Sequence, residues 1–206
     1  MIKNTKLILL DLDGVIIDTK KNMQMSWNKV QKDFGLKISF NDYFKYIGLP
    51  FEKILKKLFI KKDFNKIHKA YHNESIHRFN KIKLYPGVIK TLRDLRRRKI
   101  VLGVVTSKDK SRTIKLIKKF KINIKLVVAP SRRLKGKPFP DQLLKATKMA
   151  KIKPSNTIYI GDMLVDYKAA KNSDINFVYS EYGYGKQQTF YKHSIKKFKD
   201  LLSFSS

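Results

Sequence analysis

The sequence contains no cysteine among its 206 residues, and only 16 of them are acidic. The lack of cysteine excludes disulfide bonds and thiolate metal sites and fits a reducing compartment. No apolar run approaches the ~20 residues that cross a bilayer, and none resembles the apolar segment of a secretory signal. We therefore expect a soluble, cytoplasmic protein that does not insert into a membrane.

The scarcity of acidic residues leaves a large positive charge. Lys and Arg together number 47, so the formal net charge is +31. Such a field attracts anions, including nucleic acids and anionic lipid surfaces, without specifying a fold. Neither a helix-turn-helix pattern nor aromatic residues interleaved with basic ones accompany it. We therefore interpret the charge as lysine-rich solvated faces and expect no specific nucleic-acid partner.

Short apolar runs and helical patterns alternate over most of the chain. The apolar runs predict buried strands at residues 6–11, 100–106, 126–129, 157–161 and 176–180. Helical patterns occur among the later runs, at residues 88–98, 112–120, 141–150 and 166–171. Strands that alternate with helices indicate an α/β fold with a doubly wound parallel sheet.

Residues 18–83 interrupt this alternation. They show no convincing strand and carry helical patterns at residues 25–34, 51–59 and 64–79. Asn41 is a plausible N-cap for a further short helix. We therefore predict a sheet domain formed by residues 1–17 and 84–206, with residues 18–83 as a helical insertion.

The few acidic residues include two close pairs that follow strands. Asp11 and Asp13 follow the first strand, and Asp162 and Asp166 follow the fourth. Ligand sites of open parallel sheets lie beyond the carboxyl ends of the strands. Carboxylates gathered there repel one another unless a cation joins them, and their oxygens suit Mg²⁺.

Two further residue types at this edge suit a phosphate group. Thr106 ends the second strand and offers a hydroxyl to a phosphate oxygen, a role that Ser107 could also fill. Lys137 offers an ammonium group, with Lys135 and Lys108 as rivals. Phosphoryl transfer depends mainly on positioning and charge stabilisation, so these groups are sufficient for it.

These segments, in this order, resemble the four motifs of the haloacid dehalogenase-like hydrolases. The resemblance lies in Asp11-Leu12-Asp13-Gly14-Val15, Val104-Val105-Thr106, Lys137 with Pro138 and Asp141, and Gly161-Asp162 with Asp166. Gly48-Leu49-Pro50 and Tyr184-Gly185 are similar to segments of the phosphoglycolate-phosphatase-like branch, which carries a small α-helical cap. The resemblance implies a Rossmann-like core with residues 18–83 as that cap.

The resemblance also implies a role for each matching residue. Asp11 would form an aspartyl-phosphate, and Asp13 would act as general acid and base. Thr106, Ser107 and Lys137 would bind the phosphoryl group, while Gly48 and Leu49 of the cap would contact the rest of the substrate. The Mg²⁺ ligands would be Asp11, Asp13 (through its backbone carbonyl), Asp162 and Asp166.

We therefore expect a Mg²⁺-dependent phosphatase acting on a small phosphorylated metabolite, such as phosphoglycolate or a sugar phosphate. One alternative is a sugar-phosphate mutase of the β-phosphoglucomutase type, which shares the fold and both aspartates. Another is a non-catalytic protein that binds anions or nucleic acid. A monomer and a homodimer both fit the sequence.

Overall fold

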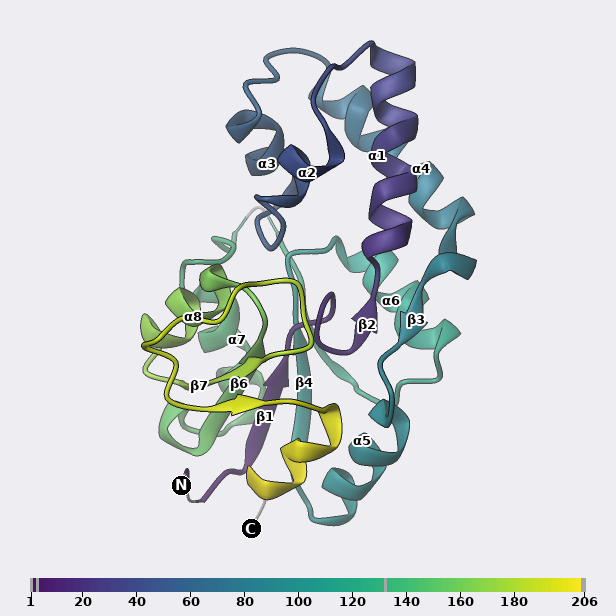
Figure 1. The fold of residues 1–206 in the computed structure, drawn as a ribbon. Helices are drawn as coiled ribbons and strands as arrows, with labels where there is room; N and C mark the ends of the chain where they lie inside the picture. Colours follow the sequence, from purple (N-terminus) through teal and green to yellow (C-terminus); the bar gives the residue numbers. More distant parts are fainter. Residues whose placement is uncertain (1, 3, 132, 205–206) are drawn as a thin grey trace.

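A parallel six-stranded sheet forms the centre of the protein (Figure 1). The computed structural model describes residues 2, 4–131 and 133–204. The strands run in the order β5-β4-β1-β6-β7-β8. Their bounds are β1 Leu7–Leu10, β4 Val101–Val105, β5 Leu126–Val128, β6 Thr157–Gly161, β7 Asn176–Ser180 and β8 Ser194–Ile195. The doubly wound parallel sheet predicted from the sequence is thus confirmed.

Alternate residues of β1 enter different cores on the two faces of the sheet. Ile8 and Leu10 pack with apolar residues of α5 (Val88–Arg97), α6 (Lys110–Lys119) and η3 (Phe198–Phe204). Leu7 and Leu9 pack with residues of α7 (Asp141–Ala150) and α8 (Leu164–Lys171). A strand buried on both faces is apolar throughout, which explains the continuous apolar run of β1.

Four helices lie together beyond the carboxyl ends of the strands (Figure 1). They are α1 Lys20–Phe34, α2 Phe40–Phe44, α3 Phe51–Lys57 and α4 Phe64–His77, followed by the short η1 Phe79–Lys81. They enclose a separate apolar cluster in which the Trp27 and Tyr43 rings stack at 4.5 Å. Two short antiparallel strands, β2 (Ile17–Asp18) and β3 (Lys83–Leu84), connect this helical unit to the sheet.

Several local details differ from the sequence predictions. Helix α1 begins at Lys20, five residues before the predicted start, because Asn22 and Ser26 are buried polar residues that interrupt the apolar pattern. The N-cap of α2 is Ser39 rather than Asn41, since the Ser39 hydroxyl accepts a hydrogen bond from the Asp42 N–H. Strands β2, β3 and β8 were not predicted, because two residues carry no periodic signal.

In the part of the chain that the structure describes, no helix has both the length and the apolar character required to cross a bilayer.

Candidate active site

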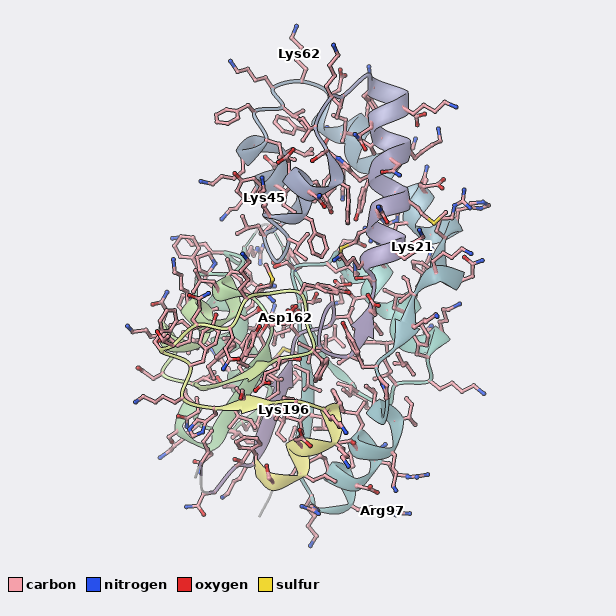
Figure 2. The ribbon with its side chains drawn as sticks, viewed as in Figure 1. Lys21, Lys45, Lys62, Arg97, Asp162 and Lys196 are labelled. Atoms are coloured by element: carbon pink, nitrogen blue, oxygen red, sulfur yellow. The ribbon has the colours of Figure 1, made fainter. Side chains whose placement is uncertain are left out.

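Three buried carboxylates meet at the carboxyl edge of the sheet. Asp11 follows β1, Asp162 follows β6, and Asp166 lies in the first turn of α8. Each side chain offers an oxygen within 4.8 Å of the other two. Asp162 lies between the sheet and the helical unit in Figure 2. The structure therefore joins Asp11 of the first acidic pair to both members of the second pair, which the sequence places far away.

The close approach of Asp162 to the β1 loop requires a glycine. Gly14 has a φ of +81°, and a Cβ atom at this position would lie 2.1 Å from Asp162 Oδ2. Any larger residue would displace the carboxylate or strain the backbone. The glycine after Asp13 thus fixes the distance between the two strand ends.

Lys137 is the buried cation of this cluster. Its ammonium lies 3.1 Å from Asp11 Oδ1 and 2.6 Å from Asp166 Oδ1, and it donates a hydrogen bond to the Tyr159 hydroxyl at 2.9 Å. The contact with Asp11 is an ion pair without hydrogen-bond alignment. The rival Lys135 is exposed to solvent. Lys137 therefore carries the charge compensation predicted for this segment.

The Asp13 carboxylate lies outside the three-carboxylate cluster and has different partners. Its Oδ1 accepts a hydrogen bond of 2.6 Å from the Thr19 hydroxyl, and its Oδ2 lies 3.1 Å from the buried ammonium of Lys108. The sequence analysis gave Thr19 no function in the site and treated Lys108 only as a rival of Lys137. In the structure both residues contact the Asp13 carboxylate.

Burial perturbs the acidic groups of the site. Desolvation, reinforced by Asp166 and Asp13 and opposed by Lys137, raises the pKa of Asp11 to about 7. Desolvation and the neighbouring carboxylates also raise the pKa of Asp162 well above its usual value. Burial alone would lower the pKa of Lys137, but Asp11 and Asp166 outweigh it and raise that pKa.

The carboxylate cluster fits a divalent cation. Among the described residues, Asp162 Oδ1 is buried with no hydrogen-bond partner, and Asp11 Oδ1 has only the ion pair with Lys137. Buried polar atoms without partners are rare and indicate a missing ligand or a catalytic function. Carboxylate oxygens are the ligands that hard cations such as Mg²⁺ prefer.

A cavity of about 500 Å³ opens above these residues, between the sheet and the helical unit. Asp11, Asp13 and Thr106 of the sheet domain line it, and so do Gly48 and Leu49 of the helical unit. Thr106 is buried, and it lines the same cavity as Asp11. Lys137, Asp162 and Asp166, which the sequence also predicted for the site, are not among the residues that line it.

Ser107 has a contact that sequence reasoning did not predict. Its hydroxyl donates a 2.6 Å hydrogen bond to the Gly48 carbonyl and so ties the helical unit to the sheet domain. Ser107 also lines the cavity. In this arrangement the hydroxyl is already engaged by the backbone of the insertion.

Tyr184 and Arg112 are further cavity residues, and sequence reasoning assigned neither of them to the site. The Tyr184 N–H donates to Asp162 Oδ2 at 2.6 Å, and its hydroxyl donates to Asp18 Oδ1 at 3.0 Å. The Tyr184-Gly185 segment, which resembles one in the phosphoglycolate-phosphatase-like branch, could have indicated Tyr184. No sequence pattern distinguishes Arg112 from the other basic residues, which number 47 in all with it.

The chain is similar to known proteins over most of its length. The sequence profile of the haloacid dehalogenase-like hydrolase family matches residues 8–180. A phosphoglycolate phosphatase of Nitrosospira multiformis is 27% identical over 199 residues, which cover 91% of this chain and 88% of the relative. A pyrophosphatase of Oceanobacillus iheyensis is 26% identical over 183 residues, covering 82% and 79% of the two chains.

A solved structure shares the fold. A haloacid dehalogenase-like family hydrolase from Streptococcus pneumoniae superposes with a TM-score of 0.83 at 20% identity, over 98% of this chain and 99% of the other. The family profile spans most of the chain. The chain therefore belongs to the haloacid dehalogenase-like hydrolases.

Proposed function

We propose that the chain is a Mg²⁺-dependent phosphatase that hydrolyses a small phosphomonoester through an aspartyl-phosphate intermediate. The observation that supports this most strongly is the buried Asp11 carboxylate, which lies on the floor of a covered cavity and contacts Lys137. Relatives named phosphoglycolate phosphatase and pyrophosphatase support phosphoryl chemistry.

Asp11, Asp162 and the backbone carbonyl of Asp13 would hold Mg²⁺ directly. Asp166 would assist through water or by orientation, because its Oδ1 already accepts from Tyr159 and contacts Lys137, and its Oδ2 accepts from the Met163 N–H. When bound, the cation neutralises negative charge on the phosphoryl oxygens and on the carboxylates.

The protein side chains account for both halves of the reaction. An Asp11 oxygen attacks phosphorus while Asp13 gives its proton to the leaving oxygen, so that the alcohol departs and an aspartyl-phosphate remains. Asp13 then takes a proton from water, which attacks phosphorus, releases phosphate and regenerates Asp11. Thr106 and Lys137 hold the phosphoryl oxygens throughout.

Residues 18–83 would serve as a cap that excludes bulk water from this chemistry. Gly48 and Leu49 would contact the leaving group, because they line the same cavity as Asp11. The hydrogen bond from Ser107 to Gly48 supports a closed arrangement of the cap over the site.

The test is hydrolysis of a generic aryl phosphate by the purified chain. Mg²⁺ should be required, and Ca²⁺ should inhibit because its larger, looser coordination disturbs the attack geometry. Asp11→Asn should abolish turnover, and Asp13→Asn should reduce it by roughly 10²–10⁴-fold. Full activity in excess chelator, or in Asp11→Asn, would contradict the proposal.

A mutase would return the phosphoryl group to a sugar phosphate instead of releasing it as phosphate. None of the relatives described above supports that activity, nor a non-catalytic function. Release of inorganic phosphate in proportion to substrate consumed would separate a phosphatase from both alternatives.

A further inference from the structure

The cavity remains large although the cap is tied down at two points. Ser107 donates to Gly48 of the cap loop, and Arg112 of α6 donates a 2.8 Å hydrogen bond to the Ser75 hydroxyl of α4. The remaining volume of about 500 Å³ is in the range of pockets that hold drug-sized ligands. A two-carbon leaving group would occupy a small part of it.

Aromatic and aliphatic side chains form most of the cap wall. Phe51 lies at its centre, with the Tyr71 ring at 4.7 Å and the Tyr43 ring at 6.3 Å. The two tyrosine hydroxyls hydrogen-bond to each other at 3.0 Å. Leu49, Ile54 and Leu55 complete the apolar part, whereas the polar cap residues at the cavity are exposed, namely Glu52, Asn65 and His68. Apolar side chains therefore outnumber polar ones on this wall.

Arg112 places a buried cation beside these rings. Its guanidinium carbon lies 5.5 Å from the centre of the Tyr71 ring, and its closest carboxylate oxygen, Asp109 Oδ2, is 3.7 Å from Nε. Among the described residues, the buried Nε has no hydrogen-bond partner. A guanidinium is weakly hydrated and stacks on aromatic faces, so it suits a ring-bearing ligand.

We infer that the substrates are phosphomonoesters whose leaving alcohol carries a flat ring, which packs against Phe51 and beside Arg112 in this cavity. This inference rests on the proposed phosphatase function and names its substrate class. The ring fills the volume that a small leaving group leaves open, and burying it against apolar side chains stabilises the bound substrate. Arg112 then contacts the π-face or a polar substituent of the ring.

The test compares 2-phenylethyl phosphate with ethyl phosphate in the presence of Mg²⁺. Their leaving alcohols have similar basicity, so a difference in kcat/KM measures the effect of the ring on binding and turnover. We expect kcat/KM to be about 10–100-fold higher for the phenylethyl ester. Equal values, or a preference for ethyl phosphate, would overturn the inference while leaving the phosphatase proposal intact.

Substitutions in the cap test whether the preference for the phenylethyl ester arises from the wall of the cavity. Phe51→Leu keeps an apolar side chain and should lower the phenylethyl-to-ethyl ratio at least about threefold. Phe34→Ala is the matched control, because Phe34 is a half-buried ring of the cap that does not line the cavity. The control should retain the ratio, and an equal loss in both variants would contradict the assigned ring site.

Arg112→Lys keeps the positive charge but removes the planar guanidinium, and it should also lower the ratio. An unchanged ratio would overturn the role of Arg112. If neither ester released phosphate, the phosphatase proposal would fail. The ratio of dissociation constants for the two esters with Asp11→Asn and Mg²⁺ would then still decide whether the ring site exists.

Discussion

The buried site contains more carboxylate groups than ammonium groups. Asp11, Asp162 and Asp166 are almost fully inaccessible, and Lys137 is the buried cation in contact with two of them. Burying an incompletely compensated charge costs free energy. The metal-free protein should therefore be strained by its own carboxylates, and a bound cation should relieve that strain.

The first prediction concerns pH and the metal-free protein. The pKa of Asp11 is about 7 in the folded chain, against an ordinary value of about 3.9. Between these values the folded state binds more protons than the unfolded state, so this residue's contribution to stability falls as pH rises. An asparagine at position 11 does not titrate, so Asp11→Asn should not lose stability in this way. The free energy of unfolding of Asp11→Asn should therefore increase relative to that of the wild-type protein as pH rises from about 5 to about 8.

Thermal unfolding in chelator measures this difference. Adding Mg²⁺ at high pH should raise the Tm of the wild-type protein, because the cation binds the folded state. The same addition should have little effect on Asp162→Asn, which lacks a proposed ligand. A pH-independent difference between wild type and Asp11→Asn would show that Asp11 is not destabilised by burial.

The second prediction separates Lys137 from its neighbour Lys135. Lys137→Met removes the cation that contacts Asp11 and Asp166, so kcat should fall by about 10²–10³-fold. Lys135→Met is the control, because Lys135 is exposed and two residues away. Steady-state kinetics should show a nearly unchanged kcat in the control. Equal effects of the two substitutions would contradict the assignment of Lys137.

The sequence predicted some of these residues better than others. Asp11 and Asp162 were accessible to prediction because each follows an apolar strand, and parallel strands end at a common edge. Arg112 and Ser75 meet across 37 positions of the chain, and Lys108 is one of many lysines. Contacts between the helical unit and the sheet domain depend on how the two are oriented, which no local pattern encodes.

At the scale of elements, all strands of the sheet except β8 were predicted within about one residue, because burial makes them continuously apolar. The apolar patterns of helices α1 to α4 are less regular than those of the strands. The packing of these helices against the sheet domain was not predicted. The loop between α2 and α3 illustrates this. Pro50 packs against Gly136, and Gly48 packs against Val165, so the loop fits closely onto the sheet domain.

The third prediction tests that fit with Gly48→Ala. Gly48 has a φ of +88°, and an added Cβ would lie 2.9 Å from Val165 Cγ2. Both effects should push the loop away from the sheet domain and lower kcat/KM by about tenfold or more. Gly35→Ala is a matched control, since Gly35 also has a positive φ, +61°, but an added Cβ there meets nothing within 4 Å.

Both alanine variants should lose about 1 kcal/mol of stability from backbone strain. Only Gly48→Ala should lose activity, because only Gly48 lies at the contact between cap and sheet domain. Equal kcat/KM values for the two variants, measured on the best available substrate, would contradict a functional role for the loop.

At the scale of the whole molecule, basic side chains extend from both ends of the protein. In Figure 2, Lys62 projects from the cap end and Arg97 from the opposite end, with Lys21, Lys45 and Lys196 between them. The net charge of +31 is therefore spread over the surface in this view and is not confined to one groove. A field distributed in this way attracts anions without selecting among them.

The fourth prediction follows from this distribution. Binding to duplex DNA should be detectable at low salt, weaken steeply as salt is added, and show no sequence preference. Fluorescence anisotropy with several unrelated duplexes measures both properties. A sequence preference that persists at physiological salt would contradict the interpretation of the charge as solvated lysine-rich faces.

The central claim is that Asp11 carries the phosphoryl group. The most direct measurement is to quench the reaction in acid during turnover, reduce any acyl phosphate with borohydride, and identify the modified peptide by mass spectrometry. Reduction of an aspartyl-phosphate gives homoserine, so homoserine should replace Asp11 only when substrate and Mg²⁺ are present. Homoserine at another aspartate, or turnover by Asp11→Asn in a preparation free of other phosphatases, would contradict the claim.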